Sequence, residues 1–153
     1  MLASREAIYS AVFAIFSGAS NFKTKGRRLK TWSDVDAERQ PALFMAQGSE
    51  VATRTKGLPT KWTLSATLYL YAHTRRDEDP IGPVINPLLD SITQLVETKA
   101  LPDGSRRALL TGETNTLGVP GVSHCWIEGD IKTDEGALGS QGVAIIPVSI
   151  LVA

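Results

Sequence analysis

The segment from Trp62 to His73 alternates strictly between two kinds of side chain. Because successive side chains of a strand point to opposite faces, this period of two predicts a long β-strand with one face in a core. The other face is expected to meet solvent or another protein. The apolar set is Trp62, Leu64, Ala66, Leu68, Leu70 and Ala72, and the alternate set is Thr63, Ser65, Thr67, Tyr69, Tyr71 and His73.

Two other segments have the helical period. The first runs from Ser4, a suitable N-cap, to Phe16, and Gly18 is expected to end it. Its apolar surface is wide enough to lie across a sheet and to meet a partner subunit on its far side. The second helix is predicted to begin with Asn86 as N-cap and Pro87 at the first helical position. Its buried stripe is predicted to be Leu88, Leu89, Ile92, Leu95 and Val96.

Further strands are predicted around the long one. Ala42–Ala46 reads as a strand, with a turn at Gly48–Ser49 and a partner strand from Val51 to Lys56. Ser123–Ile131 is a further strand, Thr133–Gln141 is a turn-rich loop, and Val143–Val152 is the closing strand, where Pro147 favours an edge position or a bulge. Strands joined by turns, with two helices, predict an α+β fold: a mainly antiparallel sheet with two helices packed on one face.

Length and composition bound the organisation of the chain. Its 153 residues, 42% of them hydrophobic, suit a single domain over residues 1–153. Residues 19–40 are expected to form a basic and polar loop, and residues 101–121 an enlarged loop. Lys+Arg and Asp+Glu are both 16, so no bulk attraction to nucleic acid is implied. No signal peptide or membrane span is predicted, so synthesis in a cytoplasm without membrane contact is expected.

Few residues could carry catalysis or bind a metal. His124 and Cys125 are adjacent, and on a strand adjacent side chains point to opposite faces, so they cannot share one metal. A buried structural Cys125 is favoured over a nucleophile. Asp77–Asp79 lies beside Arg75 and Arg76, which favours a solvated, self-neutralising turn over a catalytic pair. The sequence therefore predicts no catalytic residue, no metal site and no cofactor.

One cluster of charge remains, between Phe22 and Trp32. It is either a mobile solvated loop or a contact for an anion, such as a nucleic-acid backbone or an acidic partner surface. Since aromatic residues occur only at its two ends, specific recognition of single strands has weak support. The candidate contact residues are Lys23, Lys25, Arg27, Arg28 and Lys30.

Several segments, taken in order and spacing, resemble the tail terminator (tail completion) proteins of long-tailed bacteriophages. None is diagnostic alone, and the resemblance extends from Arg5 to Val152. The segments are Pro41-Ala42-Leu43-Phe44, Gly57-Leu58-Pro59 leading into Trp62-Thr63-Leu64, Leu68-Tyr69-Leu70-Tyr71, Asn86-Pro87-Leu88-Leu89-Asp90, His124-Cys125-Trp126-Ile127-Glu128-Gly129, and Val143 to Val152.

The resemblance implies a non-enzymatic virion protein, assembled in the host cytoplasm. Six copies would form a ring at the head-proximal end of the tail, stop polymerisation of the tail tube protein, and provide the docking surface for the neck or head–tail connector protein. Candidate subunit-interface residues are Tyr9, Phe13, Tyr69 and Tyr71. The basic cluster could contact DNA in the lumen. A neck or head–tail joining protein, and a small nucleic-acid-binding module, are the alternatives.

Overall fold

The computed structural model describes residues 3–153, and within residues 135–138 it describes the backbone only. The chain forms two α-helices, short 3-10 turns and strands that make one large and one small sheet. In order these are α1 (Arg5–Ser17), β1 (Thr24–Gly26), 3-10 turns at Trp32–Asp34 and Ala37–Arg39, β2 (Ala42–Thr53), β3 (Lys61–His73), α2 (Gly82–Glu97), β4 (Thr98–Ala100), β5 (Arg106–Ala108), β6 (Val122–Ile127), β7 (Lys132–Leu138) and β8 (Gln141–Val152).

The long strand predicted from alternation is β3, and it lies inside the main sheet. The six strands follow the order β1-β2-β3-β8-β6, with β7 also pairing β8. The β3–β8 ladder is unbroken from Trp62 opposite Val152 to His73 opposite Gln141. Every pairing in this sheet is antiparallel except that of β1 with β2. The predicted α+β class is therefore confirmed.

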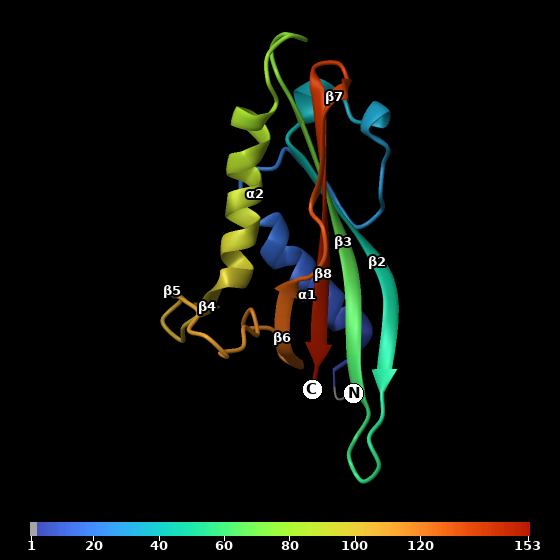
Figure 1. Cartoon of the computed structure of the whole chain (residues 1–153), viewed down its shortest axis with the longest axis vertical. Coiled ribbons are helices and arrows are strands. Elements are labelled where there is room, and N and C mark those ends of the chain that lie inside the picture. The colour runs from blue at the N-terminus through green and yellow to red at the C-terminus, as the bar shows by residue number, and fades with distance from the viewer. Residues whose placement is uncertain (1–2) are drawn as a thin grey trace.

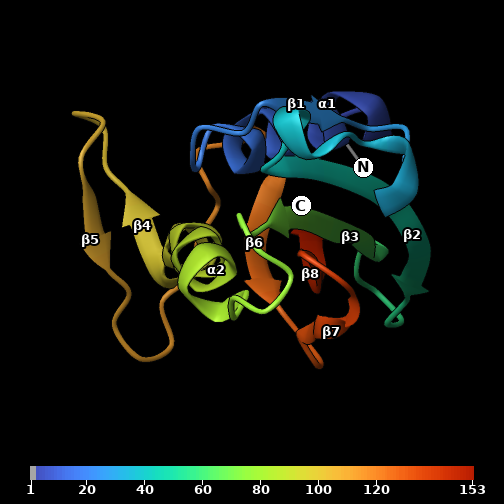
Figure 2. The same ribbon diagram turned by 90° about the horizontal axis from the view of Figure 1, so that it is seen from above.

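Both helices cover the same face of the sheet, as predicted. The main core joins apolar residues of α1 and α2 to the alternate residues of β3 and β8 on this face, from Leu64 to Ala72 and from Ala144 to Val152. In Figure 1, α1 passes behind β3 and β8, while α2 runs beside the sheet. Figure 2 shows α2 end-on beside the curved sheet and α1 at the top of the view near β1, and the small β4–β5 sheet projects beyond α2.

The predicted first helix is confirmed. The Ser4 hydroxyl accepts a hydrogen bond from the Ala7 N–H at 3.1 Å, which is an N-cap contact, and Gly18 is the C-cap. Glu6 lies in the first turn, where the helix dipole favours a carboxylate.

The predicted start of the second helix is wrong. α2 begins at Gly82 with Ile81 as N-cap, and Pro87 lies inside the helix. Ile81 and Ile85 are buried in the core, and their burial stabilises an extra turn before Asn86. The proline removes one hydrogen bond near the helix start, which this burial offsets.

The predicted turn at Gly48–Ser49 is also wrong. β2 continues through this point with a register shift between Gln47 and Glu50, and the hairpin to β3 turns over residues 54–60. Ser65 on β3 donates a hydrogen bond from its hydroxyl to the Ser49 carbonyl at 2.5 Å. A Cβ on Gly48 would lie 2.6 Å from the Ser65 Oγ, so glycine fits this bulge closely.

Two predictions near the C-terminus need correction. The expected loop Thr133–Gln141 contains most of β7, which pairs with β8. Pro147 does not put β8 at an edge, because β8 has partners on both sides. Pro147 lies where the pairing with β6 ends, at Val148, and before the pairing with β7 begins, at Ile145. Neither β6 nor β7 pairs with β8 at Pro147, so the missing N–H of the proline removes no hydrogen bond to these strands.

The two segments expected to be loops contain short strands. Residues 19–40 include β1 and both 3-10 turns, and Val35 packs with Ala42, Phe44 and Tyr71 in a second, smaller core on the opposite sheet face. Residues 101–121 include β5. Among the described helices, neither is long and apolar enough to cross a membrane.

Candidate interaction surfaces

Arg27 lies apart from the other basic residues of its segment. Its guanidinium donates to the Glu6 carboxylate, to Ser10 Oγ at 3.1 Å and to Gln47 Oε1 at 3.0 Å. It also lies 6.0 Å from the centre of the Tyr9 ring. The hydrogen bonds from Arg27 and then Ser10 lower the pKa of Glu6. Arg27 therefore fastens its segment to α1 and β2.

The remaining four predicted contact residues face solvent. Lys23, Lys25, Arg28 and Lys30 are all exposed, and Lys25 lies in β1, which pairs with β2. The Tyr71 hydroxyl donates to the Lys30 carbonyl at 2.6 Å, which fixes the far end of the stretch. The stretch is therefore held to the sheet at β1 and at Lys30, and its four exposed cations face solvent.

The four predicted interface residues lie in different surroundings. Tyr9 is fully buried, with its hydroxyl 3.3 Å from the Ser65 carbonyl, and Tyr71 is buried against Phe44. Burial raises the pKa of both tyrosines. Phe13 and Tyr69 are partly buried. In this conformation only Phe13 and Tyr69 offer surface to a neighbouring subunit.

The helix-free face of the sheet has an uncovered half. Val35 packs over the end near Tyr71, whereas Thr63 and Leu151, which pair with each other at the other end, stay partly exposed. His124 and Trp126 lie on the same face of β6, with their rings stacked at 5.0 Å. Trp126 donates from Nε1 to Glu128 at 3.0 Å. This half presents threonine, leucine and aromatic side chains.

The histidines and the cysteine do not form a joint site. His124 Nδ1 accepts from the Asn115 N–H at 2.9 Å, while Cys125 points into the core on the other face of β6. Burial raises the pKa of the Cys125 thiol to about 12. Among residues 3–134 and 139–153, no group of three or more His, Cys, Asp or Glu side chains could hold a metal ion.

Cys125 is expected to be inert in the folded protein, since the thiolate is the reactive form and a buried thiol with this pKa is almost wholly protonated. We expect no labelling by a chromogenic disulfide reagent at pH 8 within minutes. One equivalent should be labelled in denaturant. Rapid labelling of native protein would show that β6 opens readily.

Asn115 holds the segment after β5 in place, a role that no pattern in the sequence predicts. Its side chain is fully buried, donates to the Leu95 carbonyl at 2.7 Å and accepts from the Leu117 N–H at 3.0 Å. The backbone carbonyl of Asn115 accepts a hydrogen bond from the Cys125 N–H at 2.8 Å. One asparagine thus joins α2, β6 and its own loop.

Glu113 organises the outer part of the same segment. It accepts from Lys99 at 3.0 Å and from the Arg107 guanidinium. Hydrogen bonds from Lys99, Arg107 and the Leu110 N–H lower the pKa of Glu113 to about 2. The pair of cations and the carboxylate tie the β4–β5 hairpin to the loop that follows it.

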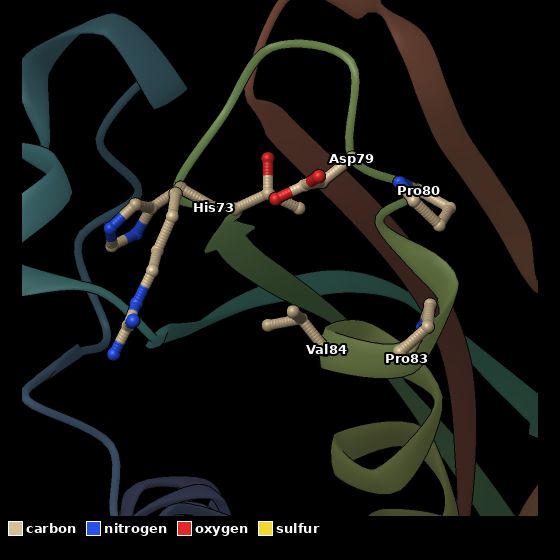
Figure 3. Close-up of a pocket in the computed structure, with 7 residues that line it drawn as sticks. His73, Asp79, Pro80, Pro83 and Val84 are labelled. Atoms are coloured by element: carbon tan, nitrogen blue, oxygen red, sulfur yellow. The ribbon is translucent and has the colours of Figure 1, made fainter.

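A pocket of about 520 Å³ lies where β3 ends and α2 begins. Figure 3 shows Pro83 and Val84 on the first turn of α2, with Asp79 and Pro80 above them and His73 on the opposite side. The walls are mainly apolar, and Val84 is 38% exposed. The sequence pointed to the charged residues Asp77–Asp79 in this loop but did not predict the pocket.

Comparisons with known proteins add little. No known family and no curated protein matches the sequence. Among solved structures, the chain is similar to a chain of the "Virion of native gene transfer agent (GTA) particle", with 8% identity and a TM-score of 0.48. That match covers 96% of this chain and 92% of the other.

Proposed function

We propose that this chain is a structural virion protein, six copies of which form a ring on the head-proximal end of a phage tail tube. The ring stops tube polymerisation and provides the docking surface for the neck or head–tail connector. Its role is assembly rather than catalysis. A neck or head–tail joining protein of the same virion is the closest alternative.

The observation that supports this proposal is the agreement between the resemblance and the fold. The resembling segments fall on β2, β3, β6 and β8, which are adjacent strands of one sheet, and on α2. The subunit implied by the resemblance, a sheet with two flanking helices, has the architecture observed here. The uncovered half of the sheet gives such a subunit a surface for a neighbour.

The exposed cations fit a position near the lumen of the ring. Lys23, Lys25, Arg28 and Lys30 form a local basic stretch on a chain whose net charge is zero. Such a stretch contacts the phosphate backbone without reading sequence. In the proposed ring, this segment would face the passing DNA.

The test is capping of growing tubes. Tail tube protein of the same virus is polymerised with and without this chain, and tubes are measured by negative-stain microscopy. We expect a ring at one tube end and arrested elongation. Tubes that elongate unchanged at saturating concentrations of this chain would contradict the proposal. Binding only to tubes that are already terminated, or to isolated connectors, would favour the neck protein.

A further inference from the structure

The turn between β2 and β3 is the most prominent projection of the molecule. Residues 54–60 extend past the body at the lower end of the view in Figure 1. Leu58 in this turn is 58% exposed, and it lies beside the end of β8, where it lines a second pocket with Leu151 and Val152. Three cations surround it and have no ion-pair partner among the side chains that the structure describes; these are Arg54, Lys56 and Lys61.

The pocket at the start of α2 has the opposite character. Its walls at Pro80, Pro83 and Val84 are apolar, and its charged lining residues are Asp79 and Arg75. Asp77 and Glu78, in the same loop, are exposed and make no ion pair within the described part of the chain. The pocket volume of about 520 Å³ leaves room for one apolar side chain and the backbone that carries it.

The surroundings of the pocket add negative charge to this end of the molecule. The Thr74 N–H donates to the Ser140 carbonyl, and Gln40 Nε2 donates to Gln141, so both 3-10 turns lie at the same end of the molecule as the acidic loop. These turns, Asp36 between them and the loop 74–80 together hold six carboxylates against three arginines. The end with the pocket is therefore acidic, while the projecting turn is basic.

Within one molecule the turn cannot reach the pocket. The two features lie at opposite ends of the longest axis of the chain (Figure 1). An exposed apolar residue and a pocket that match in chemistry but lie far apart on one surface define a heterologous contact between two copies. Repetition of such a contact produces a ring if the rotation closes.

We propose that the β2–β3 turn of one copy docks in the α2 pocket of the next copy. Leu58 packs on Pro83 and Val84, and the cations of the turn face Asp77 and Asp79. The contact is head-to-tail, with a second copy of this chain as the occupant. The inference rests on the proposed function in one respect, since it assigns the subunit contact of the ring.

Cross-linking tests the contact directly. Leu58→Cys protein is mixed with Val84→Cys protein and oxidised mildly, and we expect a disulfide-linked dimer containing one chain of each variant. The native Cys125 is buried and should contribute no background. The matched control is Leu110→Cys, because Leu110 is 70% exposed and lies outside the pocket. Equal cross-linking of Leu58→Cys to Val84→Cys and to Leu110→Cys would overturn the proposal.

Self-association provides the second measurement. Leu58→Ser should weaken association in sedimentation experiments by about tenfold or more, since one leucine loses its burial. Reversal of charge in Arg54→Glu/Lys56→Glu, or in Asp77→Lys/Asp79→Lys, should weaken association at low salt. The chain that carries all four reversals should regain it, because the attraction is restored with opposite sign. Unchanged association in every variant, or a chain that stays monomeric throughout, would overturn the proposal.

The two proposals fail in different ways. If rings form and cap tubes but Leu58→Ser rings are unaffected, the docking contact is overturned and the capping role stands. If association depends on Leu58 while tubes elongate freely, the docking contact stands and the capping role falls. If Leu58→Ser alters only tube binding, the occupant of the pocket is another protein and this inference is overturned.

Discussion

Replacing Asn115 by aspartate is expected to lower the free energy of unfolding by about 3 kcal/mol or more at pH 7. The amide now donates to the Leu95 carbonyl at 2.7 Å in a fully buried position. In Asn115→Asp a carboxylate oxygen would face that carbonyl oxygen, so a buried charge would lack a donor on this side. The loss of stability would affect the junction of α2, β6 and the loop between β5 and β6.

The pH dependence of this variant identifies the cause. Burial beside a carbonyl raises the pKa of the introduced carboxyl above its unfolded value. The folded state then binds the proton more tightly than the unfolded state, so stability falls as pH rises through this range and recovers as pH falls. Urea unfolding, followed by circular dichroism at pH 7 and at pH 5, measures this effect. The unfolding midpoint of the variant should lie closer to that of the parent at pH 5 than at pH 7.

Asn86→Asp is the matched control, since it makes the same chemical change at an exposed site on α2. A carboxylate near a helix N-terminus is neutral or slightly stabilising. If Asn115→Asp were as stable as Asn86→Asp at pH 7, the bridging role assigned to Asn115 would be wrong.

The sequence predicts the parts of this fold that obey a local period. β3 alternates residue by residue, and its predicted apolar face is buried from Leu64 to Ala72, although Tyr71 on the other face is buried as well. The predicted closing strand is β8, which alternates between buried and half-buried positions. α1 was predicted with its N-cap and its end, because Ser4 and Gly18 act on neighbouring backbone groups. In these segments, local chemistry and tertiary burial favour the same structure.

The features that were mispredicted depend on distant contacts. The start of α2 is set by burial of Ile81 and Ile85 rather than by the cap and proline at Asn86–Pro87. Gly48 looked like a turn residue, but Ser65 on the neighbouring strand makes it part of a bulge. Sequence patterns among adjacent residues could not predict either of these long-range contacts.

The candidate surfaces were predicted in composition but not in geometry. The basic cluster was found by counting charges, yet counting cannot distinguish Arg27, which binds Glu6, from Arg28, which faces solvent. The α2 pocket was missed because His73 and Val84 become neighbours only after the chain turns from β3 into α2. Asn115 carried no signal, since a single buried asparagine has no sequence pattern.

The second large effect is expected at Gly142, where β8 meets the start of α2. A Cβ there would lie 2.3 Å from Ile81 Cγ1 and 3.2 Å from both Ile81 Cβ and Cδ1. Since Ile81 is branched at Cβ and buried, it cannot turn away, and Gly142→Ala should cost about 3 kcal/mol. Urea unfolding measures this cost. Gly26→Ala is the control, because its Cβ would meet nothing closer than the Phe44 ring, at 3.7 Å.

A double-mutant cycle distinguishes this clash from a general intolerance of alanine in β8. Ile81→Ala alone should cost about 2–5 kcal/mol through the cavity it leaves. In Ile81→Ala/Gly142→Ala the new methyl group occupies space that the isoleucine vacated, so the combined loss should be smaller than the sum by about 1 kcal/mol or more. Simple additivity of the two losses would show that the close approach of α2 to β8 does not determine the need for glycine. The same contact sets the first turn of α2, so a subadditive cycle would also support Ile81, rather than Asn86, as the residue that fixes where this helix and its pocket begin.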